Sequence, residues 1–279
     1  MDYIRKLVNF YRRKVLQIFM EGYSLKDKLV LFCFLLTPGL YKFLYYWWKD
    51  DKNPKFNLLP DLICDVILKN EDGIFFCGKK IGNVYITSSV HKRKLKKYLN
   101  IKQGAFIDIG AHIGKYTVMV GRMLKDNGKV VAIEPEENNC EMLKKNAILN
   151  KLELNKNIFI QNVACYYEDK DKIPLNLVEG GSTSGHSIYD ETSKIVMRPA
   201  KKLDTILYEL KIERVDLIKI DAEKAEADIL KGAIEIIQRY HPKIIFEALD
   251  KEYLEKVKEV LRPFNYKIKE IDKVNYFAE

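Results

Sequence analysis

The chain of 279 residues has no two cysteines close together in the sequence. Its five cysteines, an odd number, are widely spaced and form no C-x-x-C pair. This pattern argues against a disulfide framework and against a zinc site. No stretch has the early apolar core and small-residue cleavage site of a secretory signal peptide. A reducing cytoplasm fits these absences best, so we expect a cytoplasmic protein.

Other patterns are missing as well. No G-x-G-x-x-G occurs, which disfavours a nicotinamide-dependent oxidoreductase. The net charge is +9, but it is spread along the chain and no basic run carries interleaved aromatic residues. Nucleic acid is therefore an unlikely partner. Two explanations of the charge stay open, namely contact with an anionic membrane surface and a surface rich in lysine and glutamate. No ligand spacing supports a metal site, so we expect none.

Residues 1–58 differ in composition from the rest and are predicted to form a helical appendage. Apolar residues recur at helical spacing between Ile4 and Phe19, and Arg5 and Arg12 lie off that stripe, which indicates a basic amphipathic helix. The apolar stretch 29–48 has the length of a membrane span.

Three interpretations of this appendage stay open. Pro38-Gly39 and Lys42 interrupt the apolar stretch and disfavour a true span. A membrane-surface or re-entrant anchor suits the aromatic cluster 45–48, which is typical of a bilayer interface. A soluble helical hairpin broken at Pro38 is the third. If the anchor exists, residues 1–52 would contact the inner face of a membrane.

Residues 59–100 are predicted to form a small β region, after a linker at 53–60. Short apolar runs bounded by turn residues predict strands at 62–68, 74–77 and 83–87, and a basic helix at 90–99. We find no chemistry in this region.

The stretch 104–116 is the most informative one. Apolar residues 105–107 predict a buried strand, Asp108 stands at its end, Gly110 and Gly114 bracket a tight turn, and residues 115–124 predict a helix. This order is the entry to a nucleotide-type pocket in a doubly wound α/β sheet. Glycine allows a ligand to approach the backbone closely, and the free N–H groups of the helix start favour an anionic or polar group.

A second strand at 129–134 ends in Glu134-Pro135. An acidic side chain at this place is suited to accept both hydroxyls of a ribose. The rest of the domain 101–279 alternates strands and helices, which predicts a mostly parallel sheet. The predicted helices are 136–150, 203–210, 225–238 and 252–261, and the predicted strands are 158–163, 174–178, 196–199, 215–220, 243–248, 266–271 and 274–277.

Polar side chains fall at the carboxyl ends of several predicted strands. They are Asp108, Glu134, Asn162, Asp221 and Glu247. Ligands of open α/β sheets bind beyond these ends, so the placement predicts a real binding site.

The motifs together resemble the FkbM family of S-adenosylmethionine-dependent methyltransferases. The resemblance covers roughly residues 100–250. It rests on Asp108-Ile-Gly-Ala-His-Ile-Gly114, Glu134-Pro135, Leu203-Asp-Thr205, Ile218-Lys-Ile-Asp-Ala-Glu-Lys-Ala-Glu226, Leu230-Lys-Gly-Ala233 and Pro242-Lys-Ile-Ile-Phe-Glu247. Lys224 stands where the family usually has glycine. The resemblance implies a class I, Rossmann-like fold closed by an antiparallel hairpin.

The resemblance also implies a site for the methyl donor S-adenosylmethionine. We expect the turn from Gly110 to Gly114, with Asp108 and His112, to hold the methionine part. Glu134 would hold the ribose, and Asn162 or the backbone of Val163 would contact adenine.

On the acceptor side we expect Asp221 and Glu223, one of them as a base or anchor, with His186 as an alternative base. The predicted reaction is O-methylation of a hydroxyl on a glycan, a lipid-linked sugar or a small molecule. An RNA methyltransferase and a non-catalytic donor-binding module, disabled by Lys224, are the alternatives. The acceptor, the choice of oxygen or nitrogen, and the oligomeric state stay open.

Overall fold

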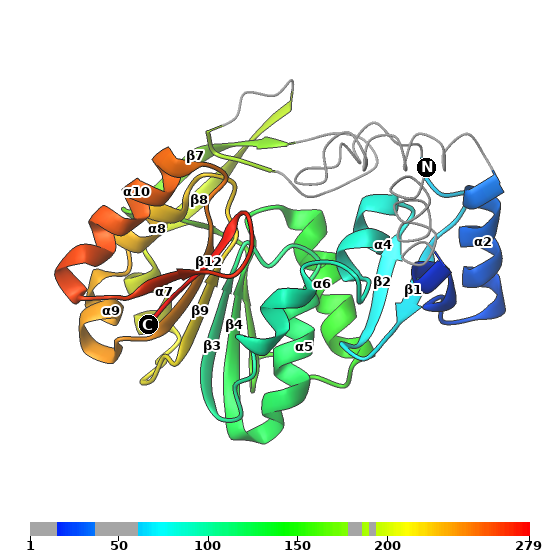
Figure 1. The fold of residues 1–279 in the computed structure, drawn as a ribbon, viewed down its shortest axis with the longest axis horizontal. Coiled ribbons are helices and arrows are strands. Elements are labelled where there is room, and N and C mark those ends of the chain that lie inside the picture. The colour runs from blue at the N-terminus through cyan, green and yellow to red at the C-terminus, as the bar shows by residue number, and fades with distance from the viewer. Residues whose placement is uncertain (1–15, 37–60, 178–185, 190–193) are drawn as a thin grey trace, which may run out of the picture. The chain divides into compact units, whose positions relative to one another are not determined.

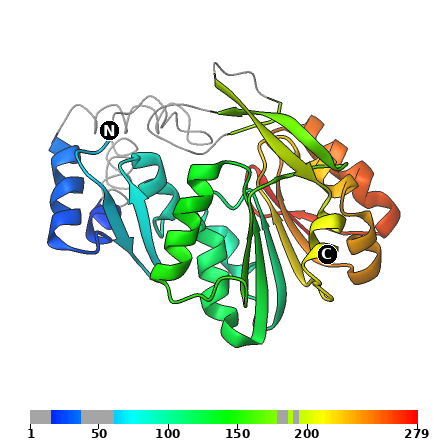
Figure 2. The ribbon, with the colours of Figure 1, turned by 180° about the vertical axis from the view of Figure 1, so that it is seen from behind.

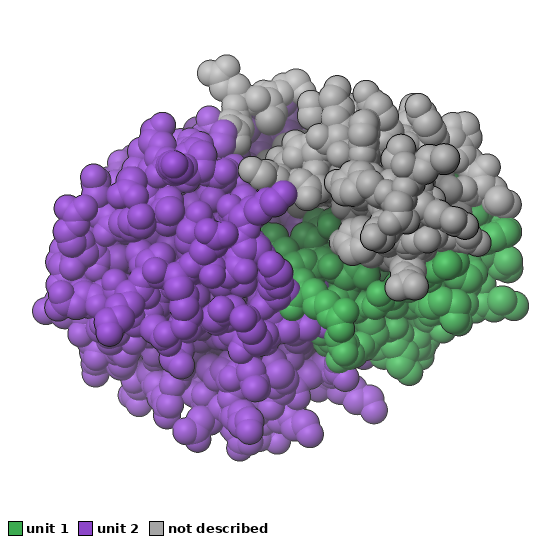
Figure 3. Space-filling model, in the orientation of Figure 1, with its two compact units in different colours: residues 1–93, 179–184 green, residues 94–178, 185–279 purple. Residues whose placement is uncertain are grey.

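The computed structural model describes residues 16–36, 61–177, 186–189 and 194–279. Contacts divide the chain into two compact units, residues 94–178 with 185–279 and residues 1–93 with 179–184 (Figure 3). Most of the predicted amphipathic helix, the linker at 53–60 and the part of the apolar stretch beyond residue 36 lie outside the described residues. The predicted domain boundaries and the membrane contact of residues 1–52 stay predictions.

The smaller unit is a β-hairpin with short helices. β1 (Val66–Lys69) and β2 (Ile74–Gly78) pair antiparallel, and α2 (Leu25–Leu36) precedes them. The Asp27 carboxylate accepts hydrogen bonds from the backbone N–H groups of Ser24 and Ile67, and so ties the start of α2 to β1. Within the described part of the chain, no helix is both long and apolar enough to cross a bilayer.

Two predictions in this region are wrong. The predicted strand 83–87 is the helix α4 (Ile81–Thr87), because Ile81 and Val84 are buried at helical spacing and the Thr87 hydroxyl donates to the Asn83 carbonyl oxygen. The predicted helix 90–99 contains only a short 3-10 helix, η2 (Arg93–Lys97), with Leu95 as its buried residue. Tertiary burial has overridden local propensity at both places.

The larger unit is built on a seven-stranded sheet, whose order is β11-β12-β10-β9-β3-β4-β5 (Figure 1). Five neighbouring strands are parallel, and β12 is antiparallel to both β10 and β11. This arrangement confirms the predicted doubly wound, Rossmann-like sheet with its closing antiparallel hairpin. The strands are β3 (Gly104–Ile109), β4 (Gly128–Ile133), β5 (Ile158–Gln161), β9 (Leu217–Ile220), β10 (Lys243–Glu247), β11 (Ile268–Glu270) and β12 (Asn275–Ala278).

Helices cover both faces of this sheet (Figures 1 and 2). Alternation along the strands decides the faces. Ile107 and Ile109 belong to the main apolar core, whereas Ala132 packs with Leu143 of α6 on the other face. The helices are α5 (Lys115–Leu124), α6 (Glu137–Leu149), α7 (Leu203–Glu209), α8 (Glu226–Lys231), α9 (Ile234–Tyr240) and α10 (Lys251–Leu261).

The predicted single helix 225–238 is wrong, because it is broken into α8 and α9. A Cβ atom on Gly232 would lie 2.1 Å from the carbonyl oxygen of Tyr166, so the chain passes too close there for a side chain. The Asp204 carboxylate then accepts the N–H groups of Glu235 and Ile236 at 3.1 and 3.0 Å and caps α9. This capping gives a structural reason for the aspartate in Leu203-Asp-Thr205.

A three-stranded sheet is inserted between β5 and α7. Its order is β6-β8-β7, with β6 (Ala164–Cys165), β7 (Lys170–Leu177) and β8 (Lys194–Lys201). β8 contains the predicted strand 196–199 and is longer, and β7 contains residues 174–177 of the predicted strand 174–178, whose last residue lies outside the described residues. This insertion brings side chains to the carboxyl ends of the main sheet.

Candidate functional site

The turn after β3 has the positive φ values that its glycines predict. Gly110, His112 and Gly114 have φ values of 71°, 51° and 90°, in the left-handed region that favours glycine. The N–H groups of Gly110 and Ala111 both donate to the carbonyl oxygen of Ile133, at 3.0 and 3.1 Å. The turn is thereby fixed to the end of β4.

Glu134, directly after β4, joins this turn to the start of α6. Its Oε2 accepts the N–H of His112 at 2.8 Å, and its Oε1 accepts the N–H of Glu136 at 3.0 Å. The side chain is buried, and burial raises the pKa of Glu134 to about 7. A carboxylate held in this way has its orientation set by two backbone groups before any ligand arrives.

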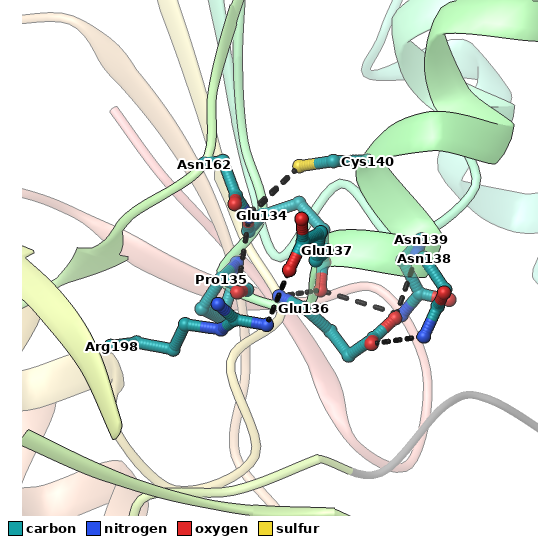
Figure 4. Close-up of polar contacts among 9 residues, drawn as sticks. All are labelled: Glu134, Pro135, Glu136, Glu137, Asn138, Asn139, Cys140, Asn162 and Arg198. Carbon is teal, nitrogen blue, oxygen red and sulfur yellow. Dashed lines mark hydrogen bonds and ion pairs between the residues drawn. The ribbon is translucent and has the colours of Figure 1, made fainter. Parts of the chain in front are cut away.

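Asn162 is hydrogen-bonded to the backbone of the segment that carries Glu134 (Figure 4). Its side-chain amide nitrogen donates to the carbonyl oxygens of Glu134 and Pro135, at 2.9 and 3.1 Å, and lies 3.3 Å from the Cys140 sulfur. The structure therefore gives Asn162 a role in fixing the segment after β4. The predicted contact of Asn162 or Val163 with adenine stays a prediction.

The start of α6 is also well anchored (Figure 4). The Glu136 carboxylate accepts the N–H of Asn139 at 2.7 Å and caps the helix. Arg198 of β8 reaches across from the inserted sheet to Glu137, with 3.3 Å between Nη2 and Oε2. Residues 134–139 are thus fixed both by the Glu136 cap within the segment and by the ion pair of Glu137 with Arg198 of the inserted sheet.

The turn after β9 carries the acidic residues of the predicted acceptor side. Asp221 is partly exposed, with 21% of its side-chain surface accessible. Glu223 and Lys224 have φ values of 49° and 81°, so two residues with side chains occupy the left-handed region in succession. The backbone at Lys224 therefore keeps the conformation that a glycine would adopt without strain.

Glu226 is hydrogen-bonded to the backbone of this turn. It is 3% exposed, and its Oε1 accepts the N–H of Ala222 at 3.0 Å. Burial, with lesser repulsion from Asp221 and Glu223, raises the pKa of Glu226 to about 7. Glu226 is thus a structural carboxyl group rather than an exposed one.

The inserted segment meets the same turn. The Ser187 hydroxyl donates to the carbonyl oxygen of Glu223 at 3.0 Å, and the Tyr189 hydroxyl donates to Asp228 of α8. His186 is the residue next to Ser187, and burial lowers its pKa below the usual value. At neutral pH the imidazole is therefore uncharged and able to accept a proton.

Lys219 is a site residue that the sequence reasoning missed. It lies inside β9 and is 2% exposed. Its Nζ is 3.3 Å from Asp221 Oδ2, 3.7 Å from Asp108 Oδ1 and 4.8 Å from the centre of the Tyr116 ring. A lysine in the middle of a buried strand was the available signal, because such a charge needs partners.

Asp108 itself is fully buried. Its Oδ2 accepts the Thr117 hydroxyl at 2.7 Å, and its Oδ1 accepts no hydrogen bond from the described residues. Burial raises the pKa of Asp108, and the Lys219 ammonium group opposes that effect. Asp108 thus faces α5 and Lys219.

The predicted site residues are linked in three sets. Gly110, His112, Gly114 and Glu134 are linked by hydrogen bonds or by the turn itself, and Asp108 and Asp221 are linked through Lys219. Glu223 is joined to the segment of His186 through Ser187. Within residues 16–36, 61–177, 186–189 and 194–279, no cluster of His, Cys, Asp and Glu is arranged to hold a metal ion.

Comparison with known proteins gives a family for this arrangement. The model of the methyltransferase FkbM domain matches residues 108–272. A search of curated proteins finds no match.

Solved structures that resemble the chain are more distant. An FkbM methyltransferase from Methylobacillus flagellatus is 19% identical with a TM-score of 0.44, over 64% of this chain and 44% of that one. An S-adenosylmethionine-dependent O-methyltransferase from Thermotoga maritima is 13% identical with a TM-score of 0.42, over 68% of this chain and 65% of that one. A methyltransferase of the same dependence from Aquifex aeolicus is 18% identical with a TM-score of 0.40, over 67% and 86%.

Proposed function

Because the chain belongs to the FkbM methyltransferase family, we propose that it uses S-adenosylmethionine to methylate a hydroxyl oxygen. The buried Glu134 carboxylate is the observation that carries the proposal. It stands at the end of β4 and accepts the N–H of His112, so it lies against the glycine turn. Both oxygens of a carboxylate retain accepting capacity beyond one hydrogen bond each, which suits the two hydroxyls of a ribose.

The residues present fit this cofactor. Asp108 Oδ1 is a buried oxygen that accepts no hydrogen bond from the described residues, and three carboxylates lie near the turn, which suits a positively charged donor. In the proposal the turn from Gly110 to Gly114 holds the methionine part and Glu134 holds the ribose. When bound, S-adenosylmethionine supplies a methyl group already activated by the sulfonium.

The protein's own part is then alignment and proton removal. Asp221 is the partly exposed carboxylate on the acceptor side, where it would orient the acceptor. His186 is the better base of the two, because its uncharged imidazole can take the hydroxyl proton, whereas the Asp221 carboxylate is paired with the Lys219 ammonium group at 3.3 Å. A hydroxyl on a glycan, a lipid-linked sugar or a small molecule remains the proposed acceptor.

Calorimetric titration of S-adenosylmethionine tests the donor site. We expect binding to the wild-type protein, and Glu134→Ala should weaken it by about 1–3 kcal/mol because a charged hydrogen-bond partner is removed. Glu141→Ala is the matched control, since Glu141 is an exposed carboxylate on α6 that pairs only with Lys144 among the described residues. No binding by folded wild-type protein would refute the proposal, and so would equal effects of the two substitutions.

A further inference from the structure

Asp108, Lys219 and Asp221 form a row of three charged side chains beneath the predicted donor turn. Lys219 Nζ lies 3.7 Å from Asp108 Oδ1 and 3.3 Å from Asp221 Oδ2. The Lys219 and Asp108 side chains are 3% and 0% exposed. We call these three residues the charge triad.

The register of the sheet builds the triad. Asp108 of β3 is directly opposite Lys219 of β9, so both side chains project to the same face. On that face α5 supplies the Thr117 hydroxyl to Asp108 and the Tyr116 ring to Lys219. Neighbouring strands place only the uncharged Ala132 and Ile245 in register with the pair.

The triad also lies against the turn after β3. A Cβ atom on Gly110 would be 1.9 Å from the carbonyl oxygen of Asp221, so the backbones of the two turns are in contact. The strands that follow β3 in the chain are added on one side of it as β4 and β5 and on its other side as β9 and β10, so the strand order reverses at β3. Ligands of open α/β sheets bind at such a point. Charges in the triad would therefore act on a bound donor at short range.

Two carboxylates and one ammonium group carry a net charge of minus one when all are ionised. Lys219 makes this state accessible, because the buried Asp108 and the partly exposed Asp221 would repel one another without a cation between them, and one would take up a proton. The Thr117 hydroxyl further stabilises the ionised form of Asp108.

S-adenosylmethionine carries one net positive charge, because its ammonium and carboxylate groups cancel and its sulfonium remains. Its demethylated product, S-adenosylhomocysteine, has lost the sulfonium and is neutral. We propose that the charge triad is a specificity element that favours the charged donor over its uncharged product. This inference rests on the proposed function and adds to it a means by which the enzyme releases its product.

Substitutions that change the charge of the triad test this idea by calorimetry with both ligands. Asp108→Asn leaves a net charge of zero, so we expect donor affinity to fall about tenfold and product affinity to change by less than about threefold. The double variant Asp108→Asn/Lys219→Met restores minus one through Asp221 alone. Its donor affinity should return to within about threefold of wild type.

Asp221→Asn provides a second, independent variant, because Asp221 is partly exposed and the change is tolerated more easily by the fold. It should also lose donor affinity selectively. Asp126→Asn is the matched control, since it removes one carboxylate whose side chain is 83% exposed. It should leave the ratio of the two affinities unchanged, and circular dichroism should show that every variant is folded.

Equal losses of donor and product affinity in Asp108→Asn and Asp221→Asn would overturn the inference, because a charge effect should act on the sulfonium of the donor and not on the uncharged sulfur of the product. Failure of the double variant to recover donor affinity would overturn it as well. Wild-type protein that binds neither ligand would instead refute the proposed function, so the two failures are distinguishable.

Discussion

The turns after β3 and after β9 lie side by side, and they reach the same kind of backbone by different means. In the first, Gly110 and Gly114 occupy positive φ, together with His112. In the second, Glu223 and Lys224 occupy it without any glycine. The first turn is sterically forced, because a side chain at Gly110 would collide with backbone. The second turn tolerates side chains and therefore stores strain instead.

The difference indicates which of the two turns has a fixed geometry. On the first turn, hydrogen bonds from Gly110, Ala111 and His112 all end on residues 133–134 of the next strand. On the second, Ser187, which lies between β7 and β8 in the chain, donates to the Glu223 carbonyl oxygen, so the geometry of this turn depends on a distant segment. We expect the donor side to be rigid and the acceptor side to be adaptable.

Gly110→Ala should have the largest effect. Its Cβ atom would lie 1.9 Å from the Asp221 carbonyl oxygen, and no rotation of a side chain can relieve a clash with backbone. We expect a loss of about 3 kcal/mol or more in the free energy of unfolding, or no folded protein, from the clash and the positive φ combined.

Gly114→Ala is the control for that substitution. The Cβ atom there would meet Leu143 Cγ at 2.9 Å, and a leucine side chain can move. The expected loss is about 1–2 kcal/mol, mostly from the positive φ. Urea denaturation of both variants measures the difference, and equal losses would show that the two turns are not in forced contact.

The sequence predicted the strand, turn and helix of residues 104–124 better than the elements that follow β9, for a physical reason. The strand, glycine turn and helix of residues 104–124 form a local pattern, and each element depends mainly on its own residues. Lys219 finds its partner Asp108 111 positions away in the chain, 219 minus 108, because strand register brings them together. The break at Gly232 depends on a backbone contact with Tyr166, the residue after β6, and no local sequence pattern contains this contact.

The same distinction applies to the site residues. Glu134 was identified from its place at a strand end, but its bond to the His112 N–H required the folded turn. The contact of Asn162 with adenine stays a prediction, and the structure adds hydrogen bonds from its amide nitrogen to the Glu134 and Pro135 carbonyl oxygens. Strand ends can be located from sequence, whereas side-chain partners at those ends cannot.

Glu226→Gln should have an intermediate effect that depends on pH. Burial raises the pKa of Glu226 from 4.5 to about 7 in the folded protein. Between these values the folded state binds more protons than the unfolded state, so stability falls as the pH rises through this window. The glutamine keeps the oxygen that accepts the Ala222 N–H. It should therefore stabilise the protein by about 1–3 kcal/mol at pH 8 and have little effect at pH 4.

Denaturant unfolding at several pH values measures this effect. Glu134 has a pKa raised to about 7 by burial on the other side of the site, so the stability of Glu226→Gln should still decline with pH but less steeply than that of wild type. Glu235→Gln, an exposed glutamate of α9, serves as the control and should leave the slope unchanged. An unchanged slope in Glu226→Gln would mean that Glu226 is solvated in solution.

Lys224→Gly should have the smallest effect and would make the second turn resemble the first. Lys224 has φ 81°, which glycine adopts without strain, but glycine also gains entropy in the unfolded chain. The net expectation is a stabilisation of about 0.5–1 kcal/mol, measured by urea denaturation.

Lys224→Ala removes the charged side chain but keeps the Cβ atom, so it should change stability by less than about 0.3 kcal/mol. If alanine stabilised the protein as much as glycine does, the lysine charge rather than its backbone would be responsible. Methyl transfer that appears only in Lys224→Gly would favour the alternative in which Lys224 has disabled the site.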